Sequence, residues 1–486
     1  MTICILTEGF QHTGYGHISR CMAFADEIKQ RGINVLFIVN GDENAPSLVG
    51  SYSIAVFDWR VEKERLMHFL SEADQVIIDS YLADVEVYKM VEEIVGCCVY
   101  IDDYNRIEYP PGIVMNGTVG AELLDYPVNK EIIYLLGKEY VIVRQAFRLP
   151  LSSKHISDTI KTILITFGGT DPKELTLPVL LKVCEWYPDS IKNVVLGAAM
   201  SKQKEITKIA ETKDGVELFY NVDAETMKEL MLQSDVAISA AGQTINELAI
   251  AGLPSVIFKV ADNQDNNIAG WLSLGFIDRF IDSTKEWRDD ELKSALKCLE
   301  EKSEREKHSK RGISVLDGRG VERIIKKLLY QYFCSNVHIS PAKEKDLMPL
   351  FELATDKVVR KNSFSTNEIT IEEHTGWFHK VLADTHRKLY VIYAKDDFVG
   401  QVRFDEEEND AVISIGIVSL FRGLGLASDI LKMTVKQYFR ETPKINSVFA
   451  YVKADNVASQ QAFMNAGFEV CVNEDTNVFK YLYKRK

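Results

Sequence analysis

The sequence predicts an α/β protein with two Rossmann-like lobes, residues 1–150 and 151–333, followed by an α+β domain over residues 337–486. Apolar runs alternate with amphipathic stretches through the first lobe, and the same alternation begins again near residue 160. After residue 337 the pattern changes to a meander of strands. The length of 486 residues agrees with several domains, since domains cluster at about 100–200 residues.

The first lobe contains short apolar runs that are separated by stretches with helical periodicity. The predicted strands are residues 3–7, 35–39, 55–57, 75–79 and 97–102, and the predicted helices are 17–31 and 85–95. This rhythm is typical of a parallel sheet flanked by helices. Asp58, Asp79 and Asp102 end or follow three of these strands, so polar groups lie at the carboxyl edge, where open α/β sheets bind ligands.

The second lobe repeats this pattern after a polar, irregular segment, residues 149–159, which we predict to be a linker. Its predicted strands are residues 162–167, 194–196, 216–219, 236–239 and 255–258, and a charged helix over about 319–332 closes the series. The cleft between two such lobes is the expected ligand site.

The third domain begins with two predicted helices, residues 343–361 and 371–382. The strands that follow are predicted at 388–394, 398–404 and 412–418, with an exposed hairpin at the charge run 405–408. A glycine-rich turn, a long helix, a strand at 447–453 and a final helix complete the domain. This order predicts an α+β fold with mostly antiparallel strands.

The bulk properties exclude several classes of protein. A net charge of −14 argues against a general nucleic-acid binder, which needs a basic surface. The N-terminus lacks the positive region and cleavage site of a signal peptide, and no apolar run reaches the roughly 18–20 residues of a membrane span. The absence of such a run predicts no membrane partner. The eight cysteines are scattered without metal-ligand spacing, so we expect reduced thiols and a cytoplasmic location. We also expect no metal. The oligomeric state stays open.

A short glycine motif follows the first predicted strand and opens a helix. It contains Gly14, Gly16 and His17. A helix N-terminus supplies free N–H groups and the positive end of the helix dipole, which disfavours an imidazolium. We therefore expect a neutral His17 that can act as a general base. The alternative, a helix-start residue beside a structural turn, is equally compatible with this motif alone.

The second lobe contains two more glycine turns after strands, and these fit a cradle for a diphosphate. The first turn includes Gly168, Gly169 and Thr170, and the second includes Ala241, Gly242, Gln243 and Thr244.

Two further groups of polar residues in this lobe each have a structural and a functional interpretation. Glu247 follows Thr244 by three residues, so the pattern slightly favours a capping box over hydrogen bonds to ribose hydroxyls. Asp262, Asn263 and Gln264 follow another strand and by themselves indicate a polar surface loop.

Together these segments resemble the UDP-sugar hydrolases of pseudaminic acid biosynthesis, which share the GT-B fold with the MurG-type glycosyltransferases. The matching segments are residues 14–21, 136–140, 143–144, 167–172, 242–247, 251–254 and 261–264. The resemblance implies that His17 activates a water that attacks the anomeric carbon, so that UDP leaves from the opposite face with inversion. Positioning and stabilisation of the diphosphate then suffice without a metal.

The resemblance also implies which residues bind the UDP-sugar. They are Gly14, Gly16, Arg20, Gly168, Gly169, Thr170, Gly242, Gln243, Thr244, Glu247, Asp262, Asn263 and Gln264. Ala241 departs from the family pattern, which has a glycine pair at this turn.

A different glycine turn lies in the third domain, between the strand that ends near residue 418 and the long helix. Consecutive N–H groups at a helix start suit a pyrophosphate, but a strand from a meander does not fit a dinucleotide-binding fold. Asn456 follows the next strand, and an Ala-Gly-Phe sequence, residues 466–468, comes after it. The structural alternative is a glycine turn followed by an N-capped helix.

This arrangement resembles the GNAT N-acetyltransferase superfamily and implies acetyl-CoA as co-substrate. By resemblance, the turn binds the pyrophosphate, a backbone amide near Ile417 or Val418 faces the thioester carbonyl, and Asn456 contacts the pantetheine arm. The implied acetyl-CoA-binding residues are Ile417, Val418, Arg422, Gly423, Leu424, Gly425, Leu426, Ala427, Asn456 and Phe463.

The proton transfers of the acetyl transfer are less defined by the sequence. Many GNAT enzymes have a Tyr at the position of Phe463 that protonates the leaving thiolate, and Phe cannot donate a proton. Another group or water then acts, or the thiolate leaves unaided. Candidates for the base that accepts the amine proton are His374, His379, Glu372 and Glu373, although each fits a solvated helix residue better.

The two resemblances predict a bifunctional enzyme of pseudaminic acid biosynthesis. The third domain would acetylate the C4 amine of a UDP-4-amino-sugar, and the first two lobes would release UDP from the resulting UDP-2,4-diacetamido-2,4,6-trideoxy-L-altrose. A covalent link raises the local concentration of the intermediate. Three alternatives are open: a glycosyltransferase with an appended acetyltransferase, a non-catalytic UDP-sugar-binding module, and the same reactions on another diacetamido sugar.

Overall fold

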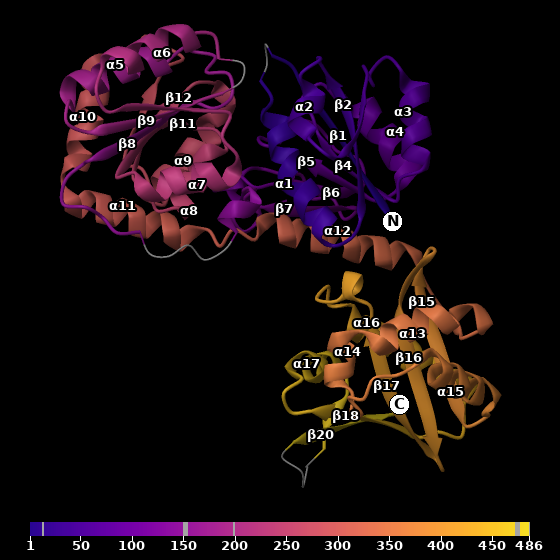
Figure 1. The fold of residues 1–486 in the computed structure, drawn as a ribbon. Helices are drawn as coiled ribbons and strands as arrows, with labels where there is room; N and C mark the ends of the chain where they lie inside the picture. The colour runs from indigo at the N-terminus through magenta and orange to yellow at the C-terminus, as the bar shows by residue number, and fades with distance from the viewer. Residues whose placement is uncertain (12–13, 149–153, 198–199, 472–476, 486) are drawn as a thin grey trace. The chain divides into compact units, whose positions relative to one another are not determined.

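The computed structural model confirms the predicted fold class, because two parallel α/β sheets precede a mostly antiparallel α+β domain (Figure 1). It describes all residues except 12–13, 149–153, 198–199, 472–476 and 486, so part of the predicted linker 149–159 lies outside the described residues. The chain divides into two compact units, Met1–Leu328 and Leu329–Lys486. The division falls inside helix α12 (Gly320–Asn336).

The first sheet is parallel throughout, with the strand order β3-β2-β1-β4-β5-β6-β7. Its strands are β1 (Thr2–Gly9), β2 (Asn34–Gly41), β3 (Ser53–Val56), β4 (Gln75–Asp79), β5 (Cys98–Ile101), β6 (Gly112–Asn116) and β7 (Ile132–Leu136). The first helices are α1 (Gly16–Gln30), α2 (Ala45–Val49), α3 (Lys63–Ser71) and α4 (Val85–Val95). The chain leaves β1 toward one edge and β4 toward the other, so the switch point where such sheets bind ligands lies between these two strands.

The second sheet is also parallel, with the order β10-β9-β8-β11-β12-β13. Its strands are β8 (Thr162–Thr166), β9 (Ile191–Leu196), β10 (Val216–Tyr220), β11 (Val236–Ala240), β12 (Ser255–Lys259) and β13 (Phe280–Asp282). Its helices are α5 (Thr176–Trp186), α6 (Gln203–Thr212), α7 (Ala224–Gln233), α8 (Thr244–Ile250), α9 (Asp265–Ser273), α10 (Asp289–Glu300) and α11 (Lys302–Val315). Helices α5, α6 and α10 pack on one face, and α7, α8 and α9 pack on the other (Figure 1).

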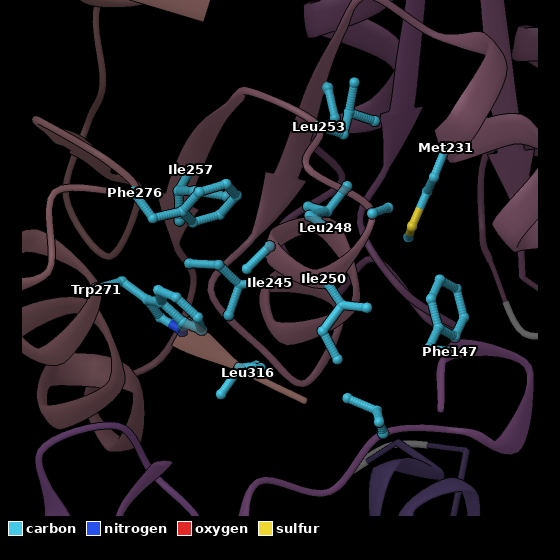
Figure 2. Packing of buried hydrophobic residues seen from close by; sticks show 14 of the residues in the cluster. Phe147, Met231, Ile245, Leu248, Ile250, Leu253, Ile257, Trp271, Phe276 and Leu316 are labelled. Atoms are coloured by element: carbon cyan, nitrogen blue, oxygen red, sulfur yellow. The ribbon is translucent and has the colours of Figure 1, made fainter. Parts of the chain in front are cut away.

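A hydrophobic cluster connects the end of the first lobe to the second sheet (Figure 2). Phe147 ends a short 3-10 helix, η3 (Gln145–Phe147), and is fully buried beside second-lobe residues that include Met231 and Leu248. Trp271 lies in the same cluster, and its indole N–H donates to Asn246 Oδ1 at 3.1 Å. The 1–328 unit therefore has apolar packing that spans its two sheets.

The 329–486 unit contains one sheet with the order β14-β15-β16-β17-β18-β20-β19. Its strands are β14 (Val337–Pro341), β15 (Arg387–Ala394), β16 (Asp397–Glu407), β17 (Asp410–Ile417), β18 (Ser447–Lys453), β19 (Glu469–Val470) and β20 (Val478–Lys484). Helices α13 (Leu347–Thr355), α14 (Lys357–Asn362), α15 (Ile371–Ala383), α16 (Leu426–Glu441) and α17 (Val457–Asn465) complete it. The charge run 405–408 covers the end of β16 and the start of the turn to β17, where Glu407 and Glu408 are exposed as predicted but the Glu406 side chain is only 4% exposed.

The junction of β17 and β18 is the irregular feature of this sheet. The two strands pair in parallel only through Asp410–Val412 and Ser447–Phe449. The last five residues of β17 and the last four of β18 continue beyond this short ladder. The strands therefore separate toward the glycine turn that follows β17.

One predicted helix is wrong. The stretch 343–361 forms a 3-10 turn, η5 (Glu344–Asp346), followed by α13 and α14 rather than a single helix. Asp356 is the reason, because its carboxylate accepts hydrogen bonds from the backbone N–H groups of Val358 and Val359, both at 3.0 Å. This N-cap starts a new helix.

Within the described residues, none of the helices is long and apolar enough to cross a membrane.

The cluster in Figure 2 leads to a stability prediction. Phe147→Ala removes a fully buried ring, so the free energy of unfolding of the 1–328 unit should fall by about 3–5 kcal/mol. Urea unfolding followed by circular dichroism measures this change. Leu123→Ala is the control, because Leu123 is 88% exposed and its removal should leave the unfolding midpoint in place. Equal midpoints for the two variants would contradict the packing role of Phe147.

Candidate active sites

The carboxyl ends of β1 and β4 bring three ionisable side chains together at the switch point of the first sheet. Glu8 lies near the end of β1, Asp79 ends β4, and His17 is the second residue of α1. The glycine motif therefore opens a helix after the first strand, as predicted. Gly14 has a φ of 91°, a left-handed conformation that favours glycine, in the turn that leads to His17.

Asp79 orients His17. Its Oδ1 lies 2.7 Å from Nδ1 of His17, and the carboxylate is fully buried. With Nδ1 held by the carboxylate as a donor, Nε2 is the nitrogen that can accept a proton. The His17 side chain keeps 18% of its surface exposed, so this nitrogen belongs to a partly open site.

The pKa of His17 is shifted in the opposite direction from the one that a helix N-terminus predicts. We expected the helix N-terminus to hold the imidazole neutral, but the pKa of His17 is raised. Burial alone lowers this pKa, and the carboxylates of Asp79 and Glu8 more than offset it by stabilising the imidazolium. The neighbouring carboxylates therefore favour the imidazolium, which makes His17 a stronger base than a free imidazole.

Arg20 forms an ion pair with the Asp79 carboxylate. Its Nε donates to Asp79 Oδ2 at 2.7 Å, and its NH1 donates to Asp103 Oδ1 at 2.7 Å. The residue is only 8% exposed. In this position Arg20 holds Asp79 rather than presenting its guanidinium to a ligand, and its contact with UDP stays a prediction.

The second-lobe motifs lie at the carboxyl ends of three adjacent strands. The turn with Gly168 follows β8, the turn with Gly242 follows β11, and the loop with Asp262 follows β12. Gly168 has a φ of 84°, which favours glycine. Because neighbouring parallel strands end at the same edge, the fold brings these predicted segments together, and their contact with UDP stays a prediction.

Individual residues of these segments differ in their surroundings. An added Cβ at Gly16, Gly169 or Gly242 would meet nothing within 4 Å, so the backbone there is open. A Cβ added to Gly14 would lie 3.7 Å from Thr170 Oγ1. Ala241, which stands where the family pattern has a glycine, is buried.

Glu247 does not form the capping box that the pattern favoured. Helix α8 has Gln243 at its N-cap and no side-chain cap hydrogen bond. Both Glu247 oxygens instead accept from Arg144, with Nε at 2.7 Å from Oε1 and NH2 at 2.7 Å from Oε2. Arg144, which belongs to the matching segment 143–144, therefore holds the Glu247 carboxylate by a bidentate ion pair. A contact of Glu247 with ribose stays a prediction.

The loop 261–264 is exposed, as its polar pattern indicated. Asn263 Nδ2 lies 3.5 Å from the Tyr81 hydroxyl, which places it near the first-lobe site. Gln264 faces its own loop, because its Oε1 accepts from the Val260 N–H at 2.9 Å. Asp262 pairs with Lys259 at 3.2 Å.

The glycine turn of the 329–486 unit has the predicted backbone form. Gly423 and Gly425 have φ values of 71° and 84°, and α16 begins at Leu426 without a side-chain cap. Leu424 and Leu426 are buried and fix the turn, while Ala427 is partly exposed in the first turn of the helix. This leaves uncapped N–H groups at a helix start, a suitable place for a phosphate group.

Two predicted contacts in this turn are already engaged within the protein. Arg422 Nε donates to the Ile417 carbonyl at 2.7 Å, and its NH2 lies 2.7 Å from Asp356 Oδ1. The Val418 N–H donates to the Val399 carbonyl at 2.9 Å. Arg422 therefore joins the turn to β17 and to Asp356, the N-cap of α14. Two backbone N–H groups were predicted to face the thioester carbonyl, and that of Val418 is already engaged in a hydrogen bond within the sheet.

Asn456 and Phe463 have structural roles as well as predicted ones. Asn456 is the N-cap of α17 and its Oδ1 accepts from the Ser459 N–H at 3.2 Å. Phe463 is 4% exposed, and its ring centroid lies 5.0 Å from that of Phe468 and 6.0 Å from that of Tyr481. Phe463 is thus a core residue, and the contacts of both residues with acetyl-CoA stay predictions.

Among the candidates for the amine base, His374 differs from our expectation of a solvated residue. It is 3% exposed, its ring lies between Phe351 and Trp377 with centroids 5.5 Å and 5.2 Å away, and burial lowers its pKa. Its Nε2 has no hydrogen-bond partner among the described residues. His379 is exposed beside Glu344, Glu372 is exposed, and Glu373 caps α15 with Thr370.

One cluster outside these sites has the residue types of a metal site. Ligand atoms of Asp278, Glu304 and His308 lie within 4.8 Å of one another. Lys307 Nζ already pairs with both carboxylates, at 3.2 Å from Asp278 and 2.9 Å from Glu304. The ammonium group supplies the positive charge that these carboxylates require.

Comparisons with known proteins agree with both resemblances. Residues 336–469 match the family described as acetyltransferase (GNAT) domain. Over 278 residues, 57% of this chain, the sequence is 26% identical to the pseudaminic acid cytidylyltransferase and UDP-2,4-diacetamido-2,4,6-trideoxy-beta-L-altropyranose hydrolase of Helicobacter pylori. The predicted resemblance to a hydrolase of this kind joined to a GNAT domain is confirmed.

Two other relatives have different descriptions. An uncharacterized protein of Methanocaldococcus jannaschii is 28% identical over 53% of this chain, and the spore coat polysaccharide biosynthesis protein SpsG of Bacillus subtilis is 25% identical over 54%. The matches cover 55% of the archaeal protein, 79% of SpsG and 47% of the Helicobacter pylori protein. The chain thus spans about half the length of two of these relatives.

The His17–Asp79 contact predicts a measurable titration. In Asp79→Asn the imidazolium loses its main stabilising charge, so the pKa of His17 should move down. NMR of histidine-labelled protein measures it, with His17→Gln to assign the resonance. Asp103→Asn is the control, because it removes the other carboxylate of Arg20 and leaves Asp79 in place. If His17 titrates alike in both variants, Asp79 does not control it.

Proposed function

We propose that this protein is a bifunctional sugar-nucleotide enzyme. Its 329–486 unit transfers acetyl from acetyl-CoA to the C4 amine of a UDP-4-amino-sugar, and its 1–328 unit hydrolyses the resulting UDP-2,4-diacetamido-2,4,6-trideoxy-L-altrose to release UDP. The observation that supports the hydrolase most strongly is the buried Asp79 carboxylate at 2.7 Å from His17 Nδ1. The name of the Helicobacter pylori relative supports the substrate.

In the proposed hydrolysis, His17 is the general base. Nε2 accepts a proton from water as the water oxygen bonds to the anomeric carbon, and the bond from that carbon to the UDP oxygen breaks with its electron pair remaining on UDP. Asp79 stabilises the imidazolium that forms, and the second-lobe turns at the ends of β8 and β11 bind the diphosphate. Attack opposite the leaving group inverts the configuration.

In the proposed acetyl transfer, the turn 422–427 binds the pyrophosphate of acetyl-CoA, and the separated ends of β17 and β18 accept the pantetheine arm. The match of residues 336–469 to the GNAT domain and the uncapped start of α16 support this assignment. The amine nitrogen bonds to the acetyl carbon, the thioester C–S bond breaks with its electron pair remaining on the CoA thiolate, and the amine gives up a proton. His374 is the buried candidate for its acceptor.

A second candidate keeps both reactions and changes the sugar. SpsG of Bacillus subtilis matches this chain at nearly the same identity, and its name refers to a spore coat polysaccharide. A few side chains in the cleft decide the stereochemistry of the accepted sugar. Product analysis by NMR with several UDP-amino-sugars separates the two candidates.

The two activities should be separable by one substitution each. With UDP-4-amino-sugar and acetyl-CoA, His17→Ala should stop UDP release and leave CoA release intact. Ala427→Glu should stop CoA release, because a carboxylate at the start of α16 repels a pyrophosphate while it suits the helix dipole. Ala427→Glu should still release UDP from the diacetamido sugar.

Coupled assays for free CoA and free UDP measure both reactions in the wild type and in each variant. Wild-type protein that releases neither product would refute the whole proposal. Persistent UDP release in His17→Ala would show that His17 is not the base, and UDP release that requires an added sugar acceptor would indicate a glycosyltransferase.

A further inference from the structure

Glu8 is the ionisable residue beside His17 to which the sequence had assigned no role. Its Oε1 lies 4.0 Å from Nε2 of His17, the nitrogen opposite the one that Asp79 holds. The residue is only 6% exposed and stands near the carboxyl end of β1, next to β4 at the switch point of the sheet. Glu8 therefore faces the reactive side of the proposed base.

The protein holds this carboxylate in a fixed orientation. Oε1 accepts from the Tyr81 N–H at 2.9 Å, and Oε2 accepts from the Leu82 N–H at 3.2 Å and from the Ser80 hydroxyl. The Tyr81 ring meets the His17 ring edge-on with centroids 4.6 Å apart, so the same turn fixes both groups. Each carboxylate oxygen has more than one lone pair, so Oε1 can accept a further hydrogen bond besides the one from Tyr81.

The spacing between Glu8 and His17 is too long for a direct hydrogen bond and suits a water between them. A water about 2.8 Å from each acceptor bridges two atoms that are 4.0 Å apart, with an angle of about 90° at its oxygen. Both of its O–H groups then point at protein acceptors. Its two lone pairs then lie on the side away from both acceptors, and one of them can point toward a bound substrate.

We propose that Glu8 and His17 together hold and orient the attacking water, an inference that rests on the proposed hydrolase function. His17 Nε2 takes one proton as the water oxygen bonds to the anomeric carbon and UDP departs with the electrons of the broken bond. Glu8 Oε1 accepts the second O–H throughout and keeps no proton at the end. Glu8 also stabilises the imidazolium, because it lies on the side of the ring that receives the proton.

A purely structural role for Glu8 is the alternative, since it also holds the turn 80–82. Two variants separate the roles. Glu8→Gln keeps the shape and removes the charge, so kcat for UDP release should fall about 100-fold with little change in KM, and the acid limb of the kcat/KM profile should move to lower pH. Glu8→Asp keeps the charge and withdraws it, so kcat should fall while the acid limb stays in place.

Asp235→Asn is the matched control. Asp235 is another buried carboxylate, and it accepts from the backbone N–H groups of Lys161 at 2.8 Å and Thr162 at 2.9 Å. Because Asp235 precedes β11 and lies at the amino end of that strand, Asp235→Asn should leave the acid limb unchanged. Thermal unfolding of each variant checks the fold, and the NMR titration of His17 in Glu8→Gln reports the lost charge without turnover, as a lower pKa.

The outcomes separate this proposal from the function on which it rests. Wild-type protein that releases no UDP from the diacetamido sugar overturns the proposed function, and the role of Glu8 falls with it. Wild-type turnover with an unchanged kcat or an unshifted acid limb in Glu8→Gln overturns the role of Glu8 alone. Should Glu8→Gln fail to fold, Glu8→Asp with wild-type kcat overturns the proposal equally.

Discussion

The buried carboxylate of Asp79 is the interaction on which the first candidate site depends. A charge with no exposed surface is costly unless it is paired, and Asp79 is paired with Arg20 and His17 at once. Burial opposes ionisation, but the Arg20 guanidinium and the His17 imidazole lower the pKa of Asp79 well below its usual range. Arg20 is in turn neutralised by Asp103, which also accepts from the Tyr81 hydroxyl. The position of His17 therefore follows from a network of ionic hydrogen bonds that engages Nδ1 and leaves Nε2 in the partly open site.

The two candidate sites use different irregularities of their sheets. In the first sheet the chain departs in opposite directions from β1 and β4, and the ends of these strands supply Glu8 and Asp79. In the third sheet, β17 and β18 pair over three residues and then separate, and the turn 422–425 follows the end of β17, which there pairs with β16 and not with β18. In both sites a helix begins close to the point where the sheet is irregular. The first backbone N–H groups of a helix have no partners within the helix, so they can bind a ligand there.

The sequence predicted the elements of the fold better than it predicted the partners of the polar residues. Strand and helix periodicity located β4, α4 and α15 closely, because periodicity is a local property. The Arg144–Glu247 pair joins residues 103 positions apart, so the local pattern around Glu247 suggested a cap instead. His374 lies among charged neighbours in sequence but turns toward Phe351 and Trp377, and only tertiary packing reveals that burial. Glu8 carries no motif, and its proximity to His17 depends on where α1 begins relative to the end of β1, a distance that periodicity does not give.

Each candidate site is built from residues of one compact unit. Glu8, His17 and Asp79 belong to Met1–Leu328, and the turn 422–427 belongs to Leu329–Lys486. In each site the arginine pairs with a carboxylate of its own unit, Arg20 with Asp103 and Arg422 with Asp356. In the proposed bifunctional enzyme, the covalent link between the units raises the local concentration of the intermediate at the second site.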